Sequence, residues 1–347
     1  MNEPKTIRVA IIGAGKMGTR HAQAWARLPG AEIIALADER QDVAREIAQM
    51  VGADSAGIFA DAASLLESVG ESVDAVSICL PTPLHRSVAE AALGAGKHVI
   101  CEKPMALTIA DTDAMVAAAE KSGTVFTVAQ VVRFFPEYAS AKRSVEGGAV
   151  GIPASVRTRR GGDFPRGTND WYADVDQSGG VIFDLLIHDI DWAQWCFGPI
   201  VRVYAQGLTE RLADKRLHHL DYALLTCRHE NGVVSHLEAT WADPGGFVTT
   251  FEIAGDAGLL THDSRKSSSL SKSVRGEKTA ANGGVPSSPL ISEENPYYQQ
   301  IAAFADAVRG EAPLAVPSQD ARQAVAVAAA ARESLRTGVT VTVQNSP

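Results

Sequence analysis

Lys103, Asp184 and His188 are the side chains whose types and surroundings best suit acid–base chemistry. Asp184 and His188 are four positions apart in a segment predicted to be helical over 183–195, so both are expected on one face of that helix. An imidazole with a carboxylate one turn away is suited to proton transfer near neutral pH. The alternative is a histidine that is satisfied inside the core, and Asp189 and Asp191 are further carboxylates that could partner it.

Lys103 belongs to the segment Glu102-Lys103-Pro104, directly after a predicted strand over 98–101. In open α/β sheets, ligands bind at the carboxyl ends of the strands, so Lys103 is expected to point toward a bound ligand. Its ammonium group can hydrogen-bond a reacting hydroxyl and favour the alkoxide form. The alternative is a surface lysine before a turn.

A glycine motif, Gly13-Ala14-Gly15-Lys16-Met17-Gly18, follows a predicted strand and opens a predicted helix. In this setting Gly13 permits a tight turn, Gly15 lets the backbone approach a pyrophosphate, and Gly18 lets helix and strand pack closely. The helix N-terminus supplies N–H groups to the phosphates. We therefore expect this segment to bind a dinucleotide; the alternative is a glycine-rich turn without a ligand.

Asp38 ends the second predicted strand, 20 residues after Gly18. A carboxylate there accepts hydrogen bonds from the adenosine ribose hydroxyls and repels a 2′-phosphate. This favours NAD over NADP as the cofactor. Arg40, two residues later, is the side chain that could instead turn toward a phosphate.

The first 130 residues alternate strand and helix signals. Apolar strand runs are predicted at 7–12, 33–37, 74–80, 98–101 and 125–129, and helices at 16–28, 40–50, 84–95 and 109–121. Strands separated by helices imply right-handed crossovers and a doubly wound parallel sheet of the Rossmann type. We therefore predict an α/β first domain over residues 1–130.

After residue 150, predicted strands follow one another, at 154–159, 201–206, 222–229, 233–240 and 248–253. Asn231-Gly232 is a strong hairpin signal between two of them. Helices are predicted at 183–195, 297–308 and 318–336, and a last strand at 339–343. Residues 263–290, rich in Ser, Gly and Lys, read as a long or weakly stranded loop, with disorder as the alternative. This pattern predicts an α+β domain with a large, mostly antiparallel sheet over 131–347, its C-terminal helix able to return to the first domain.

Length and charge narrow the class of protein. With 347 residues the chain is long enough for two domains. The net charge of −9 argues against a protein that binds nucleic acid by neutralising phosphates. No apolar run approaches a membrane span, the first residues lack a signal-peptide pattern, and the four cysteines are scattered without a metal-ligand spacing. We expect a cytoplasmic protein without a metal site.

Nearly the whole chain resembles the Gfo/Idh/MocA oxidoreductases, named for glucose–fructose oxidoreductase and inositol dehydrogenase. The motifs that carry the resemblance are GAGKMG at 13–18, PTPLH at 81–85, CEKPM at 101–105, VVRFFPEY at 131–138, SGGVIFDLLIHDIDW at 178–192 and ARESLRTGVTVTV at 331–343. One departure is Val181, where many members have a third consecutive glycine. The resemblance implies a Rossmann domain followed by an α+β domain whose open sheet usually mediates dimer or tetramer contacts.

The same resemblance implies roles for individual residues. Lys103 would touch substrate and nicotinamide, His188 would accept the proton of the substrate hydroxyl, and Asp184 would help to orient both. Five further positions would lie at the cofactor or the substrate cavity: Pro81 and His85 near the nicotinamide ribose, Glu102 close to the cofactor, and Arg133 with Trp171 lining the cavity. Arg157, Arg159 and Arg160 could meet an anionic substrate, or belong to a solvated strand face.

These observations lead to the expectation of an NAD-dependent dehydrogenase that oxidises a secondary alcohol of a cyclic polyol or sugar. Two alternatives stay open: a glycosidase that uses bound NAD only transiently, and a non-catalytic, nucleotide-dependent regulatory protein.

Overall fold

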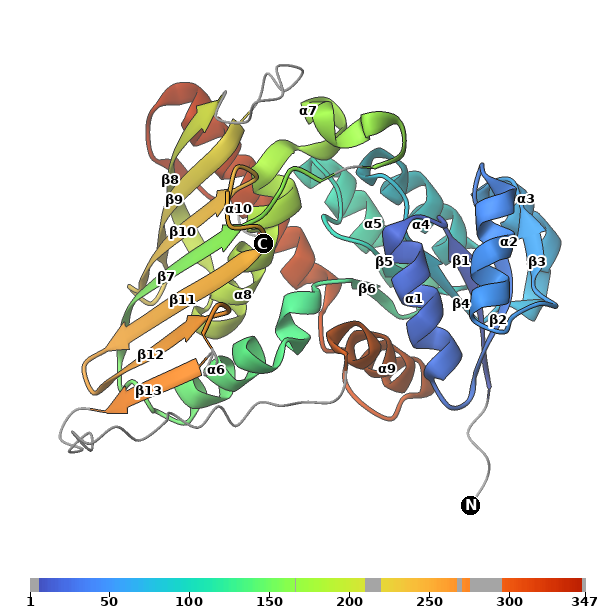
Figure 1. Cartoon of the computed structure of the whole chain (residues 1–347), viewed down its shortest axis with the longest axis horizontal. Coiled ribbons are helices and arrows are strands. Elements are labelled where there is room, and N and C mark those ends of the chain that lie inside the picture. The colour runs from blue at the N-terminus through green and yellow to red at the C-terminus, as the bar shows by residue number, and fades with distance from the viewer. Residues whose placement is uncertain (1–5, 166, 210–219, 267–269, 275–294, 345–347) are drawn as a thin grey trace. The chain divides into compact units, whose positions relative to one another are not determined.

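The computed structural model describes residues 6–165, 167–209, 220–266, 270–274 and 295–344 (Figure 1). The chain forms two compact units, one of Met1–Val131 with Glu294–Arg322 and the other of Val132–Glu293 with Gln323–Pro347. Residues 294–322, which lie within the predicted second domain, thus group with the first unit. Among the described helices, none combines the length and the apolar character that crossing a membrane requires.

The first unit contains a six-stranded parallel sheet in the order β3-β2-β1-β4-β5-β6. Its strands are β1 (Ile7–Ile12), β2 (Ala31–Ala37), β3 (Gly57–Phe59), β4 (Ala75–Ile78), β5 (His98–Cys101) and β6 (Phe126–Val128). The order reverses between β1 and β4, which is the switch point where doubly wound sheets bind their ligands. The predicted Rossmann-type fold is confirmed.

The helices of this unit are α1 (Lys16–Arg27), α2 (Gln41–Met50), α3 (Ala62–Val69), α4 (His85–Gly94), α5 (Ile109–Ser122) and α9 (Pro296–Arg309). One core cluster joins α1, α2 and α9 to the sheet, and Trp25 of α1 meets Phe304 of α9 edge to face. Most predicted elements of this unit agree with these bounds within two residues. The sequence patterns missed β3 and α3, because a three-residue strand and a two-turn helix are too short to show a period.

The second unit contains an eight-stranded sheet in the order β13-β12-β11-β7-β10-β9-β8-β14. The strands are β7 (Pro153–Gly161), β8 (Ile200–Thr209), β9 (Leu220–His229), β10 (Val234–Thr240), β11 (Val248–Gly255), β12 (Gly258–Asp263), β13 (Leu270–Val274) and β14 (Val341–Thr342). Only β7 and β10 pair in parallel among these described strands; the other pairs are antiparallel. The predicted mostly antiparallel sheet is confirmed.

The helical part of the second unit consists of α6 (Pro136–Glu146), α7 (Val175–Ser178), a π-helical turn (Ile182–Leu186), α8 (Ile187–Phe197) and α10 (Ser318–Thr337), the last of which spans the boundary between the units. Trp192 of α8, Tyr138 of α6 and Phe251 of β11 pack in one aromatic cluster against the sheet. The opposite sheet face carries the outward side chains of β7, β9 and β10. Buried and outward residues alternate along these strands because successive side chains of a strand point to opposite faces of the sheet.

One helix of the second unit was not predicted, one predicted loop is described only in part, and one predicted helix differs in its first turn. Residues 136–146 form a helix that no pattern predicted. In the segment 263–290, predicted as a long or weakly stranded loop, Asp263 ends β12 and Leu270–Val274 form β13, while residues 267–269 and 275–290 lie outside the described residues. The helix predicted over 183–195 has a π-helical first turn, which a pattern based on the α-helical period cannot reveal.

Candidate functional site

The glycine motif of the first unit has the geometry of a dinucleotide-binding turn. Gly13 has a positive φ of 100°, and a Cβ there would lie 2.3 Å from the Cys79 carbonyl oxygen. A Cβ at Gly18 would lie 1.8 Å from the Gly13 carbonyl oxygen, so the helix and the turn meet too closely for any side chain. A Cβ at Gly15 would meet nothing within 4 Å, which leaves open space on the side where a pyrophosphate would approach.

The N-terminus of α1 beside this space is suited to an anion. Gly15 caps the helix without a side-chain hydrogen bond, and the first turn, which includes Lys16 and Met17, contains no acidic residue. The N–H groups at such an end attract negative charge. The residues of this turn therefore fit the diphosphate of a dinucleotide.

Asp38 lies immediately after β2 and organises the turn next to it. Its Oδ2 accepts the N–H of Ala14 at 2.7 Å, and its Oδ1 accepts the backbone N–H of Arg40 at 2.9 Å and the Nε–H of the same residue at 3.2 Å. A carboxylate has about four acceptor positions, so hydrogen bonds to ribose hydroxyls remain available to it. The Arg40 side chain is turned back onto Asp38, which supports the predicted preference for NAD.

His85, predicted to lie near the nicotinamide ribose, is fully buried at the start of α4. Its Nδ1 lies 2.9 Å from the Pro104 carbonyl oxygen, and its Nε2 lies 2.8 Å from the Leu80 carbonyl oxygen. Burial lowers the pKa of His85 despite these carbonyl contacts. The ring thus links the segments that follow β4 and β5, while Pro81, next to Leu80, is half-buried.

Glu102 and Lys103 follow β5, next to β4 in the same sheet. Glu102 is buried; its Oε1 lies 3.2 Å from His21 Nε2, and its Oε2 accepts the Lys103 backbone N–H at 3.1 Å. Burial by itself would lower the pKa of His21, but Cys79 and Glu102 outweigh it and raise the pKa to about 10. Lys103 itself is half-buried just after the carboxyl end of β5. Open α/β sheets bind their ligands at the carboxyl ends of their strands.

Asp184 and His188 lie at the start of the helical segment of the second unit, after Gly179 and Gly180 with their positive φ. Asp184 is buried in the π-helical turn, and its Oδ2 accepts the Trp241 indole N–H at 3.2 Å. His188 is half-buried in the first turn of α8. The α-helical spacing argument therefore does not apply across this pair, since one of the two lies in a wider turn. Such turns are frequent at functional sites.

Asp189 and Asp191 have arginine partners inside the second unit. Asp189 pairs with Arg160 at 2.6 Å and 3.3 Å, and Asp191 pairs with Arg133 at 2.8 Å and 2.6 Å. All four side chains are buried. These pairs remove both aspartates as the first choice of partner for His188. The guanidinium groups of Arg133 and Arg160 are thus bound to carboxylates inside the unit. A substrate contact of Arg133 stays a prediction.

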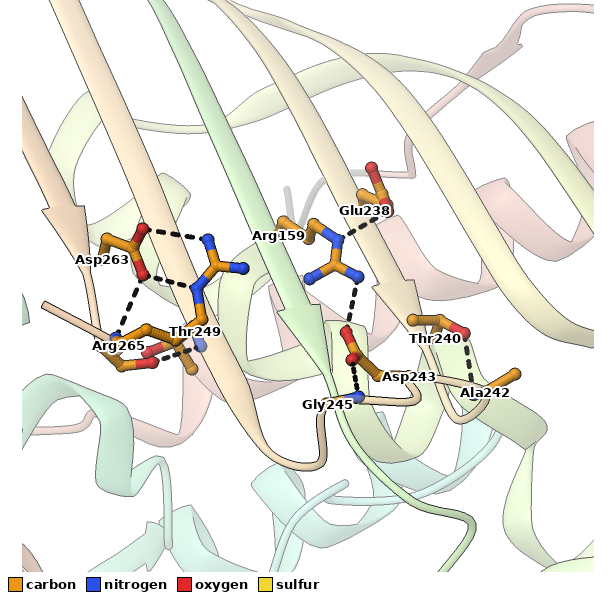
Figure 2. A network of polar contacts seen from close by, with 10 residues as sticks. Arg159, Glu238, Thr240, Ala242, Asp243, Gly245, Thr249, Asp263 and Arg265 are labelled. Atoms are coloured by element: carbon orange, nitrogen blue, oxygen red, sulfur yellow. Dashed lines mark hydrogen bonds and ion pairs between the residues drawn. The ribbon is translucent and has the colours of Figure 1, made fainter.

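Arg157 and Arg159 belong to the outward face of the second sheet. Arg157 pairs with Glu252 of β11, and Figure 2 shows Arg159 between Glu238 of β10 and Asp243. These side chains alternate with the buried residues of β7, as expected for a solvated strand face. For Arg157 and Arg159 the geometry favours the solvated face, whereas Arg160 is buried and paired with Asp189, so the solvated-face interpretation is wrong for Arg160.

Trp171, predicted to line the substrate cavity, lies in the irregular helical segment Thr168–Ala173. Its ring stacks on Tyr172 with centroids 3.9 Å apart, and both are half-buried. Asn169 and Asp170 before it have φ values of 58° and 53°, in the left-handed region that Asn and Asp tolerate better than other non-glycine residues. A substrate contact of Trp171 stays a prediction.

The sequence patterns did not reveal two residues that contact predicted site residues: His21, which contacts Glu102, and Trp241, which donates a hydrogen bond to Asp184. His21 faces inward on α1, three residues after Gly18, and Trp241 directly follows β10. A histidine on an otherwise apolar helix face was the available signal for the first. Within the described part of the chain, no group of three or more His, Cys, Asp or Glu side chains could hold a metal ion.

Comparison with known proteins agrees with this geometry. Residues 7–130 match an oxidoreductase family with an NAD-binding Rossmann fold, and residues 138–261 match the GFO/IDH/MocA C-terminal domain. The chain is 28% identical to myo-inositol 2-dehydrogenase of Thermotoga maritima, over 95% of this chain and 96% of that protein. It is 31% identical to an inositol 2-dehydrogenase/D-chiro-inositol 3-dehydrogenase of Shouchella clausii, over 74% and 72% respectively. Levoglucosan dehydrogenase in complex with NADH has a similar structure, with a TM-score of 0.88 at 25% identity over 99% of this chain and 100% of that one.

Proposed function

The chain belongs to the Gfo/Idh/MocA oxidoreductase family, and on that premise we propose that it oxidises a secondary alcohol of a cyclic polyol or sugar. NAD is the cofactor of its Rossmann domain, and when bound it supplies the acceptor for the hydride of the carbinol carbon. One observation carries the proposal. The glycine turn, which fits a dinucleotide, follows β1, Lys103 follows β5, and both strands belong to the same sheet.

The catalytic roles are assigned to Lys103, Asp184 and His188. His188 takes the hydroxyl proton as general base, because an imidazole is the side chain best suited to that step near neutral pH. Lys103 stabilises the negative charge that develops on the substrate oxygen. Asp184, held by Trp241, orients the imidazole and the substrate.

The cofactor contacts are assigned to the first unit. The turn Gly13–Gly18 holds the diphosphate and Asp38 the adenosine ribose. Pro81 is the residue assigned to the nicotinamide side. His85 and Glu102 are assigned an indirect part, because their polar atoms bond to protein groups.

The decisive experiment is an absorbance screen at the NADH band with purified protein, run with NAD and then with NADP. Inositols, hexoses, pentoses, anhydrosugars, amino sugars and glycosides form the panel. Substrate-dependent NADH formation, lost in Lys103→Met and His188→Asn by on the order of 10²-fold or more, supports the assignment. Full activity in both variants would show that the roles are wrong, and glycoside cleavage without net NADH would favour the transient-oxidation alternative.

Self-association is the second part of the proposal. We assign it to the outward face of the second sheet, where Leu208 and Leu224 are 51% and 43% exposed on the adjacent strands β8 and β9. A second copy seated on this face would cover these two leucines, which is what supports the assignment. Light scattering should find a dimer or tetramer, and Leu224→Lys should shift it toward the monomer; a wild-type monomer would exclude the proposal.

The cytoplasm is the proposed location. All four cysteines are free, which is typical of proteins kept in a reducing compartment. Fractionation of the source cells tests this, and recovery of the protein outside the cytoplasm would contradict it.

A further inference from the structure

The loop Glu102–Met105, which carries Lys103, is attached to α1 by a buried histidine. The Nε2 atom of His21 lies 3.2 Å from Glu102 Oε1, and the other carboxylate oxygen accepts the Lys103 N–H at 3.1 Å. The His21 ring is fully buried, and Glu102 is nearly so. The backbone of Lys103 is therefore tied through one carboxylate to the helix that begins at the glycine turn.

A second buried histidine attaches the other side of the same loop to α4. His85 Nδ1 lies 2.9 Å from the carbonyl oxygen of Pro104, the residue after Lys103. Its Nε2 lies 2.8 Å from the carbonyl oxygen of Leu80. A neutral imidazole has one N–H, so the two carbonyl oxygens share a single donor unless the ring gains a second proton.

We propose that His21 and His85 are positioning residues that together hold the backbone on both sides of Lys103. Each ring is closed off from solvent, so neither touches the substrate. Their effect on turnover passes through Lys103, and this part rests on the proposed function. The effect on the loop itself does not, because it follows from the hydrogen bonds alone.

The two histidines use different ring nitrogens toward the loop, which provides a matched test. The amide nitrogen of a glutamine can take the place of Nε2, and that of an asparagine can take the place of Nδ1. We therefore expect His21→Gln and His85→Asn to keep the loop contact, and His21→Asn and His85→Gln to lose it. Asn and Gln differ by one methylene group at both positions. An effect of side-chain size alone would therefore favour the same residue at both positions and would not produce this crossed pattern.

The first readout is amide hydrogen exchange of the peptide over residues 101–107 in the full-length protein, without substrate. The two variants that lose the contact should exchange faster there by on the order of tenfold, and the two that keep it should stay within about threefold of wild type. The second readout is kcat on the best substrate of the screen. It should fall on the order of ten- to a hundredfold in the same two variants, while NADH affinity from fluorescence titration changes little.

His229 provides the control, since it is also buried and contacts the Gly198 carbonyl oxygen and the Ser235 hydroxyl through its two ring nitrogens. His229→Asn and His229→Gln should leave the exchange of 101–107 unchanged. Glu102→Ala removes the acceptor without altering either histidine and should reproduce the fast exchange of His21→Asn.

Equal exchange for Asn and Gln at both positions, or slow exchange in Glu102→Ala, would overturn the proposal. If the screen finds no substrate, the exchange pattern still decides it, so its failure is distinguishable from failure of the proposed function. A crossed exchange pattern with unchanged kcat would overturn the positioning of Lys103.

Discussion

The indole N–H of Trp241 donates a hydrogen bond of 3.2 Å to the carboxylate of Asp184, and both side chains are buried in the second unit. The donor comes from the end of β10 and the acceptor from the π-helical turn before α8. A hydrogen bond to a charged group is worth about 1.5–3 kcal/mol, and this one fixes one oxygen of a proposed catalytic carboxylate.

Trp241→Phe should therefore lower kcat by about tenfold or more while leaving NADH affinity nearly unchanged. Trp25→Phe is the control, because Trp25 is also buried and donates its indole N–H to the Ser77 hydroxyl at 2.9 Å. It should reduce the melting temperature without a specific loss of kcat. An equal loss of kcat in both variants would indicate general destabilisation instead.

Gly15→Ala should fold as stably as wild type but bind NADH at least about tenfold more weakly. The added methyl group meets no protein atom within 4 Å and enters the space assigned to the pyrophosphate. Gly94→Ala, at the end of α4, also meets no atom within 4 Å and should change neither property. Thermal melting measures the stability of each variant, and fluorescence titration measures its NADH affinity. Undiminished NADH affinity in Gly15→Ala would show that the cofactor lies elsewhere.

Asp38→Ser should raise the ratio of kcat/KM for NADP over that for NAD by about tenfold or more. The substitution removes the charge that repels a 2′-phosphate and releases the Arg40 side chain, whose Nε–H now bonds to Asp38. The double variant Asp38→Ser/Arg40→Ala should lose most of the gain with NADP. If Arg40→Ala in the double variant makes no difference, Arg40 takes no part in phosphate binding.

The pH dependence of stability should contain a contribution from His21. Its pKa is about 10 in the folded chain and 6.5 without the contacts, so the folded state holds the proton more tightly. The stabilisation is fully present below about pH 6.5 and is lost as the pH rises toward 10, by at most about 1.4 kcal/mol per pH unit. Urea unfolding from pH 6 to 10 should show a steeper alkaline loss for wild type than for His21→Gln; parallel curves would contradict the raised pKa.

The ion pair of Arg160 and Asp189 should matter far more to stability than that of Arg157 and Glu252. The first pair is buried, so Asp189→Asn leaves an uncompensated charge and should cost about 3–5 kcal/mol of unfolding free energy. In the second pair Arg157 is 60% exposed, so Glu252→Gln should cost less than about 1 kcal/mol. Denaturant unfolding of both variants tests the contrast, and similar losses would contradict it.

The local patterns of the sequence determined the type of both domains and the place of the cofactor turn. A buried parallel strand such as Ile7–Ile12 is recognised by its nearly continuous apolar residues. The glycines at 13, 15 and 18 are recognised by a spacing that a tight turn, a phosphate approach and close helix packing require. These features depend on neighbours in the chain, so they can be recognised without a structure. The roles of Lys103 and His188, in contrast, are implied by the family resemblance and stay predictions.

Only the tertiary structure decided which side chains hold the site together. His21 and Glu102 are 81 positions apart, and Arg133 and Asp191 are 58 apart, so no local period connects them. Their contacts exist because buried polar groups require partners and the packing of distant elements selects which partner is available. The same holds for His85, whose ring nitrogens lie 2.9 Å and 2.8 Å from the carbonyl oxygens of Pro104 and Leu80, on segments that no local pattern connects; its place near the nicotinamide ribose stays a prediction.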